Sequence, residues 1–323
     1  MGHRIGMVAT GGTISMRRGD EGKAHRPELG AAHLVSMLDE GARVSDVEVT
    51  MYEPHRIPSE DLSFSLLSNL AKTIEQALTE NDSVIVTHGT DTMEDAAFFV
   101  AEALGNPDVI FTGSMLPADH PEYDGISNLT ASFIVARSEE SMGTIICMYR
   151  YCLPAWSAIK RDSAAMDAFN IREGKAVARL IENEVERITK RPTANWIGDF
   201  KILDDRDPIV PILTLGVGTS PDALELMTSV AKGIVIETTG TGSVPISMKE
   251  AIIETSRQIP VIVTTRCANG PTIAQDVYPN KWDELLENGV HFENHLDSFK
   301  ARTRLILTIS LEREYEAFRV TPI

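Results

Sequence analysis

Short runs of apolar, often β-branched residues alternate along this chain with longer stretches in which apolar residues recur every three or four positions. The short runs are typical of buried strands, and the longer stretches are typical of amphipathic helices packed on a sheet. Alternation of this kind favours right-handed β-α-β crossovers and a mostly parallel sheet. The sequence therefore predicts an α/β fold.

The expected elements form two series. The first has strands at 5–9, 47–51, 84–87, 109–111 and 144–148 and helices at 62–78, 93–104 and 126–136. The second has strands at 209–215, 233–237 and 261–265 and helices at 221–231, 248–258 and 282–287. Two series in a chain of 323 residues favour two domains.

The segment 186–208 separates the two series. It is polar, contains Pro192 and Pro208, and lacks sustained periodicity, which predicts a β-hairpin edge followed by a linker. We expect a larger N-terminal α/β domain over 1–189, with a mostly parallel sheet flanked by helices. A linker over 190–208 and a smaller C-terminal parallel-sheet α/β domain over 209–323 complete the predicted organisation.

The charge balance is strongly acidic, with 30 Lys and Arg against 47 Asp and Glu and a formal net charge of −17. No basic run interleaved with aromatic residues interrupts it, so nucleic acid is not an expected partner. The first ten residues lack the apolar stretch of a signal peptide, and no segment approaches the roughly 18 apolar residues of a membrane span. We therefore expect a cytoplasmic protein that does not bind membranes.

The cysteines and histidines do not predict a metal site. Cys147, Cys152 and Cys267 lack paired C-x-x-C spacing and are interpreted as reduced structural thiols. His291 and His295 have helical spacing, but the residues between them match no zinc motif. We expect neither a metal nor an organic cofactor.

Two motifs follow predicted strands, where open parallel sheets place their sites. After the first strand comes Thr10-Gly11-Gly12-Thr13-Ile14, whose glycines allow a sharp turn that presents Thr13. By itself this segment is equally compatible with a plain turn. A phosphate-binding loop is disfavoured, because neither G-x-G-x-x-G nor G-K-[ST] occurs.

The second motif, His88-Gly89-Thr90-Asp91-Thr92-Met93-Glu94-Asp95, opens directly into a predicted helix. A helix N-terminus offers unpaired N–H groups and a positive dipole, which suit a carboxylate or a developing oxyanion. An ordinary alternative is N-capping, in which Asp91 or Thr92 is followed by Glu94 or Asp95. Capping explains one hydroxyl or carboxylate and not the whole motif.

Together, the two motifs resemble those of the asparaginase family. Further matches follow in order along the whole chain: Thr112-Gly113-Ser114-Met115, Pro117, Asp124-Gly125, Asn128-Leu129, Lys160 nine residues before Phe169, and Lys300-Ala301-Arg302. The resemblance implies an amidohydrolase that acts on a small amide, with L-asparagine as the default substrate. It also implies a homo-oligomer, usually a dimer of dimers, in which the smaller domain completes the neighbouring subunit's site.

Carried over residue by residue, the resemblance makes Thr13 the acyl-accepting nucleophile and groups Thr90, Asp91 and Lys160 as a second triad. The implied substrate-binding residues are Gly12, His55, Gly89, Ser114, Met115 and Ser243. A threonine hydroxyl is a poor nucleophile at neutral pH and needs a base within hydrogen-bond reach, which a neutral Lys160 could supply. Without the resemblance, Lys160 would be interpreted as a solvated surface charge.

Several positions depart from the family pattern. The family activates its nucleophile with a tyrosine in the following loop, yet residues 15–42 contain none. Pro54 and His55 are counted where a serine and a small polar residue usually meet the substrate's α-carboxylate. Leu116 stands where an arginine commonly follows the methionine, and Ser243 stands where an asparagine often reaches the neighbouring site.

These departures affect recognition of a free amino acid and leave three hypotheses. The first is an asparaginase with a rearranged lid. The second is a relative acting on another amide, a lactam or an imide, with Arg56 or His55 gripping its polar end. The third is a non-catalytic binding protein that has kept the scaffold.

Overall fold

The computed structural model describes residues 3–17, 26–38, 47–138, 140–203, 208–273, 276–279 and 281–321. The chain forms two compact units, one over residues 1–192 with residue 323 and one over residues 193–322. Among the described residues, no helix is long and apolar enough to cross a membrane.

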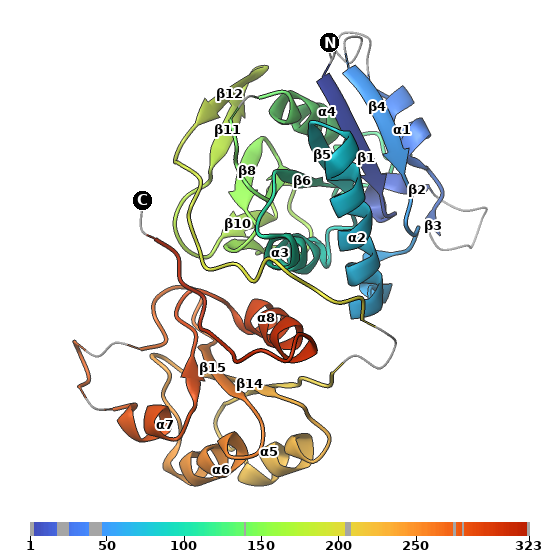
Figure 1. Ribbon diagram of the computed structural model, residues 1–323. Coiled ribbons are helices and arrows are strands. Elements are labelled where there is room, and N and C mark those ends of the chain that lie inside the picture. Colours follow the sequence, from blue (N-terminus) through green and yellow to red (C-terminus); the bar gives the residue numbers. More distant parts are fainter. Residues whose placement is uncertain are drawn as a thin grey trace. The chain divides into compact units, whose positions relative to one another are not determined.

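The first unit is built on an eight-stranded sheet in the order β12-β11-β8-β7-β6-β5-β1-β4 (Figure 1). Five neighbouring strands are parallel: β4 (Val47–Tyr52), β1 (His3–Ala9), β5 (Ser83–Thr87), β6 (Val109–Thr112) and β7 (Ile145–Met148). Three antiparallel strands extend the sheet: β8 (Tyr151–Pro154), β11 (Ala178–Ile181) and β12 (Glu184–Arg187). Every residue of β5, β6 and β7 is buried, as expected for strands covered on both faces.

Helices cover both faces of this sheet (Figure 1). On one face, α1 (Ala31–Ser36) and α4 (Gly125–Ala136) bury residues such as Leu34 and Leu129 against alternate strand residues such as Ile5 and Ile85. The opposite face packs against α2 (Phe64–Glu80) and α3 (Met93–Leu104). Inward-facing side chains, which recur every second residue in the strands and about every 3.6 residues in the helices, thus pack into one core.

The sheet reverses its direction of growth between β1 and β5. From β1 the chain adds β4 on one side, and it later adds β5, β6 and β7 on the other. The helix after β1 (α1) and the helix after β5 (α3) lie on opposite faces. Such a reversal leaves a crevice at the carboxyl ends of the two strands, which is where ligands bind in open α/β sheets.

Short elements complete the rim of this crevice. Two 3₁₀ turns, η1 (Thr13–Ser15) and η4 (Ser59–Asp61), follow β1 and β4. Two small antiparallel pairs are formed by β2 (Met16–Arg17) with β3 (Arg26–Pro27) and by β9 (Ala158–Lys160) with β10 (Phe169–Ile171).

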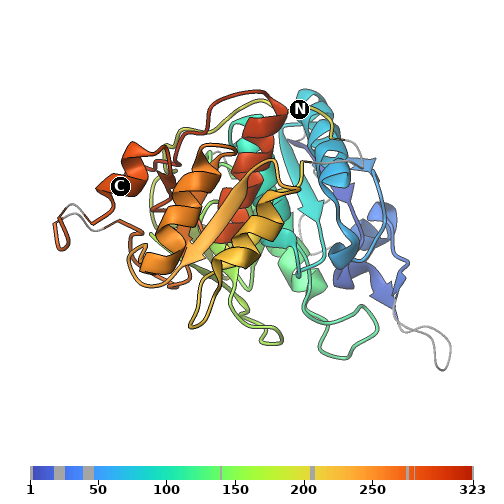
Figure 2. The ribbon, with the colours of Figure 1, turned by 90° about the horizontal axis from the view of Figure 1, so that it is seen from below.

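The second unit has a parallel four-stranded sheet in the order β13-β14-β15-β16. Its strands are β13 (Ile212–Thr214), β14 (Ile234–Thr238), β15 (Val261–Thr265) and β16 (His291–Phe292). Its helices are α5 (Pro221–Thr228), α6 (Ile246–Ser256), α7 (Asp283–Glu287) and α8 (Ser298–Ser310). The helices α5 and α6 (gold and orange in Figure 2) cover one face, and α8 (red) covers the other, where Gly233 leaves room for Leu305.

The expected α/β class, with a larger, mostly parallel sheet and a smaller parallel sheet, is confirmed, and three antiparallel strands make the larger sheet mixed. The hairpin expected within 186–208 is wrong, because the hairpin is formed by β11 and β12 and ends at Arg187. Its turn was not recognised since Glu182 adopts a φ of 55°, a left-handed conformation that glutamate rarely takes. The long helix α8 was not expected at all.

Candidate active site

Two glycine-containing loops meet backbone to backbone at the carboxyl ends of β1 and β5. A Cβ on Gly12 would lie 2.2 Å from the Cα of Gly89, and Gly12 has a φ of 77°, so only glycine fits here. The N–H of Gly12 donates to the carbonyl of Ile57 at 3.1 Å, which fixes the loop from its other side. Thr13 begins η1 immediately afterwards and is half-buried.

Three side chains from two distant parts of the sequence converge beside this contact. Lys160, at the end of β9, donates from Nζ to Thr90 Oγ1 at 3.0 Å and to Asp91 Oδ1 at 2.5 Å. The lysine side chain is 12% exposed, whereas that of Asp91 is 64% exposed and open to a ligand. The backbone N–H of Lys160 donates to Glu94 Oε2 at 2.5 Å, which ties β9 to the first turn of α3.

The N-capping alternative does not account for these side chains. Thr92 is the N-cap residue of α3, but its hydroxyl makes no capping hydrogen bond and donates instead to the carbonyl of Ser59 at 2.8 Å. The carboxylates of Asp91 and Glu94 accept hydrogen bonds from Lys160. Polar groups that could have capped the helix therefore organise Lys160 and η4.

Ser59 is the site residue that the sequence analysis missed. It is buried in η4, and a Cβ on Gly89 would lie 2.5 Å from its Oγ. Ser59 thus lies beside Gly89, five residues after Pro54, the position at which the family's serine was counted. An isolated bridge between Gly11 and Ile57 brings η4 to the site, and no local pattern signals this long-range pairing.

Two histidines lie close together next to the loops. Burial and, to a lesser extent, the nearby His55 lower the pKa of His88 to about 4, although a hydrogen bond to the Gly89 carbonyl opposes the shift. Burial also lowers the pKa of His55, whose two ring nitrogens have no hydrogen-bond partner within the described residues. Arg56 is occupied, because it pairs with Glu53 at 2.6 Å and donates to the carbonyl of Glu28.

The loop after β6 is held from within. Ser114 is fully buried, and its hydroxyl donates to the carbonyl of Leu116 at 2.7 Å. The N–H of Met115 donates to the carboxylate of Asp124 at 3.0 Å, and the amide of Asn128 donates to the same carboxylate at 2.9 Å. The hydroxyl of Ser114, a predicted substrate-binding residue, is therefore already hydrogen-bonded within its own loop.

Comparisons with known proteins agree with this geometry. A family model described as the N-terminal domain of asparaginase matches residues 4–193, and one described as the glutaminase/asparaginase C-terminal domain matches residues 209–320. The chain belongs to the asparaginase family. As a member, it is an amidohydrolase that acts on carbon–nitrogen bonds.

Individual asparaginases match along nearly the whole chain. A probable L-asparaginase from Deinococcus radiodurans is 29% identical over 98% of this chain and 96% of the relative. A subunit of the glutamyl-tRNA(Gln) amidotransferase from Archaeoglobus fulgidus is 25% identical over 90% of this chain and 71% of the relative. The solved structure of a probable cytoplasmic L-asparaginase from Campylobacter jejuni aligns with a TM-score of 0.81 at 25% identity, covering 95% of both chains.

Ser243, the predicted substrate-binding residue in the second unit, lies in a tight turn. It forms an isolated bridge with Thr239, and its Oγ accepts a hydrogen bond from Lys281 Nζ at 2.8 Å. The same ammonium group lies over the rings of Tyr278 and Trp282 at 4.7 and 5.1 Å. Ser243 is therefore already linked to a cation within its own unit.

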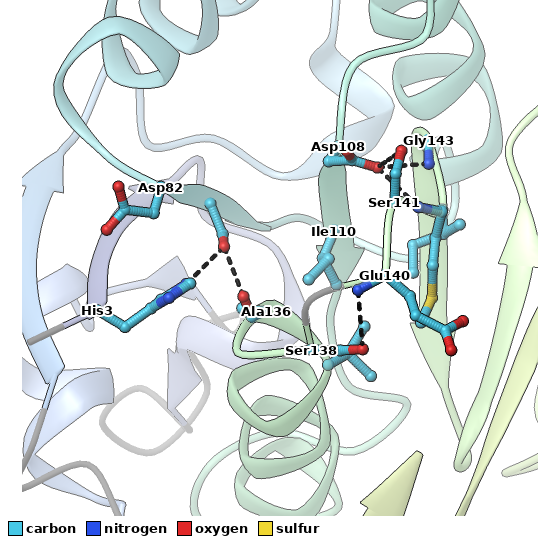
Figure 3. Close-up of a pocket in the computed structure, with 13 residues that line it drawn as sticks. His3, Asp82, Asp108, Ile110, Ala136, Ser138, Glu140, Ser141 and Gly143 are labelled. Carbon is cyan, nitrogen blue, oxygen red and sulfur yellow. Dashed lines mark hydrogen bonds between the residues drawn. The ribbon is translucent and has the colours of Figure 1, made fainter. Parts of the chain in front are cut away.

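A separate cavity of about 260 Å³ lies at the opposite, amino ends of the strands (Figure 3). Its polar groups bond to one another: His3 Nε2 lies 2.8 Å from Ser83 Oγ, which donates to the Ala136 carbonyl at 2.5 Å. The carboxylate of Asp108 accepts from the N–H of Gly143 at 2.6 Å. These bonds join loops and present no convergent reactive groups. Within the described residues, no group of three or more His, Cys, Asp and Glu could hold a metal ion.

Proposed function

We propose that this asparaginase-family enzyme hydrolyses the side-chain amide of L-asparagine through the hydroxyl of Thr13. The observation that carries the proposal is the position of Lys160 Nζ, within hydrogen-bond distance of both Thr90 and Asp91. Because Gly12 packs against Gly89, Thr13 and the cluster around Lys160 border the same crevice. A nucleophile and a proton-transfer group from separate loops are what acyl transfer requires.

The proposed reaction has two halves. The Thr13 oxygen attacks the amide carbon, the C–N bond breaks, and the hydroxyl proton leaves with the nitrogen as ammonia. Water then cleaves the resulting ester of Thr13, which regenerates the hydroxyl and releases the acid. The hydrogen bond from Lys160 to Thr90 offers a route for the proton. Backbone N–H groups near Gly89 and the N-terminus of α3 favour the negative charge on the reacting oxygen.

Complementary groups for both ends of a free amino acid support asparagine as the substrate. The exposed carboxylate of Asp91 suits an α-ammonium group. Ser59, packed against Gly89, supplies the hydroxyl that suits an α-carboxylate. The hypothesis of a different amide substrate rested partly on the absence of a serine at position 54. The nearby hydroxyl of Ser59 answers that argument.

L-Glutamine is the second candidate, because several matched relatives are described as subunits of a glutamyl-tRNA(Gln) amidotransferase. Its side-chain amide has the same chemistry and differs by one methylene, which a pocket distinguishes by only about 1–3 kcal/mol. Lactams and imides are disfavoured, since Arg56, one of the two groups expected to grip them, is held by Glu53, and burial lowers the pKa of the other, His55, which favours its uncharged form.

The test is an ammonia-release assay on L-Asn, D-Asn, L-Gln and a panel of cyclic amides and imides. We expect ammonia from L-Asn, with at least a hundredfold lower rates for Thr13→Ala and Thr90→Val. Control variants of exposed residues, such as Thr79→Val, should retain wild-type rates. Ring opening without ammonia, or tight ligand binding without turnover, would reject the proposal.

A further inference from the structure

The loop over residues 116–124, here the 116–124 loop, lies against the turn that carries Thr13. The phenol of Tyr123 donates a hydrogen bond to the carbonyl of Ile14 at 2.7 Å. The N–H of Ala118 donates to the carbonyl of Met16 at 2.9 Å. Two hydrogen bonds from one loop thus hold the chain after Thr13, one within η1 at Ile14 and one at Met16 in β2.

The Tyr123 ring is confined. It packs against the core cluster beneath α4, and a Cβ on Gly125 would lie 2.2 Å from the ring's Cζ and hydroxyl oxygen. Only glycine at the start of α4 leaves room for the ring in this position. Burial raises the pKa of Tyr123 well above its ordinary value, and nearby Asp124 adds to the shift. The phenol therefore remains protonated, as a donor to Ile14 requires.

The base of the 116–124 loop is equally well fixed. The carboxylate of Asp124 accepts hydrogen bonds from the N–H groups of Met115 and Leu116, each at about 3.0 Å. The same carboxylate accepts from Asn128 in α4. The contacts of Asp124 therefore tie the two ends of the 116–124 loop together. Because the loop is fixed in this way, the hydrogen bond from Tyr123 holds the Ile14 carbonyl in place.

We propose that Tyr123 is a positioning residue that sets the orientation of the Thr13 hydroxyl through the Ile14 carbonyl. Before Thr13, the turn is held by Gly12, through its hydrogen bond to Ile57 and its contact with Gly89. After Thr13, the Tyr123 phenol donates to the carbonyl of Ile14 from outside the turn, and the Ser15 hydroxyl donates to the carbonyl of Gly12 at 2.9 Å from within it. This inference rests on the proposed function, since it assigns a purpose to the orientation of Thr13.

The test compares Tyr123→Phe with Tyr52→Phe. The control removes a phenol of the outer strand β4 that donates to Glu80, at the end of α2, at 2.6 Å. We expect Tyr123→Phe to lower kcat by about 10- to 100-fold, because small misplacements of reacting groups have effects of this size. KM should change less than about twofold, since the substrate-binding groups are untouched. The control should leave both constants unchanged.

Hydrogen–deuterium exchange provides a readout that does not depend on turnover. Amides in the peptide 10–17 should exchange faster in Tyr123→Phe than in wild type, and peptides from α2 should not change. All measurements are made at a temperature well below the Tm of each variant. Unchanged exchange at 10–17, or faster exchange with an unchanged kcat, would overturn the positioning role. A wild-type enzyme inactive on every amide would reject the proposed function, while the exchange experiment would still test the hold of Tyr123 on the turn.

Discussion

Lys160 is a single side chain that links β9 to a loop seventy positions earlier in the sequence. Replacing it with methionine keeps the volume and removes the charge and both hydrogen bonds. We expect Lys160→Met to lower kcat by about 10²- to 10⁴-fold, the usual contribution of a proton-transfer group. Ammonia release and circular dichroism check this expectation. Lys72→Met, on the exposed side of α2, is the matched control, and near-wild-type turnover of Lys160→Met would exclude the proposed relay.

His88 couples the site to pH. Its pKa is about 4 in the folded chain, compared with an ordinary value of 6.5, so the unfolded chain binds the extra proton first. Stability from this group is complete above pH 6.5 and is lost as the pH falls towards 4, at about 1.4 kcal/mol per pH unit. Urea unfolding between about pH 7 and 4.5 should therefore show a shallower pH slope for His88→Asn than for wild type. The exposed His33→Asn should keep the wild-type slope, and an unchanged slope in His88→Asn would contradict the prediction.

At the residue scale, the sequence could indicate groups that stand in contiguous motifs. Thr13, Thr90 and Asp91 stand in short strings after predicted strands, and the resemblance of these strings to the asparaginase family singled them out. Ser59 and Tyr123 could not be found in this way. Each depends on a long-range contact, of η4 with Gly89 or of the 116–124 loop with Ile14, which leaves no periodicity in the sequence.

Among the elements, the small hairpin of β9 and β10 has the greatest influence on the site. It pairs only three residues on each strand and carries Lys160 at its end, so its position depends on outside support. That support includes Glu94 in α3, which accepts from the Lys160 N–H. The first turn of α3 thus positions the backbone of this lysine, and Asp91, just before the helix, positions its side chain.

This arrangement predicts that Glu94→Ala impairs the enzyme without contacting the substrate. We expect kcat to fall by about tenfold or more while KM changes little, because the lysine is displaced and the binding groups remain. Glu94→Gln, which keeps an acceptor oxygen, should lose less. Steady-state kinetics of both variants beside the exposed Glu75→Ala provides the check. Equal activity of Glu94→Ala and Glu75→Ala would show that α3 does not support the hairpin.

The elements in the middle of the sheets were predictable, whereas those at the edges were not. Buried strands such as β5 and β15 consist of continuous apolar runs bounded by polar turns, and their bounds differ from the expected ones by at most one residue. β8, β9 and β10 are only three or four residues long. For strands this short, side-chain alternation has too few repeats to distinguish a strand from a loop.

For the whole molecule, we expect a homotetramer in which each dimer shares its sites, as the family resemblance implies. Light scattering at assay concentration checks the mass. Thr13→Ala and Ser243→Val subunits, each inactive by itself, should regain activity when unfolded, mixed equally and refolded. Half of the random dimers then contain one intact site of two, which gives about a quarter of wild-type activity. A fully active monomer, or no recovery on mixing, would reject shared sites.

The cavity at the amino ends of the strands has a practical consequence (Figure 3). The five residues of β5 separate it from the reacting groups, a distance of about 16 Å at 3.3 Å per residue. Its lining includes the exposed Glu140, at the end of the sheet opposite to the proposed active site. A linker to a solid support or a fluorescent dye can be attached there, through a cysteine introduced at Glu140 together with Cys267→Ser, which removes the exposed native thiol.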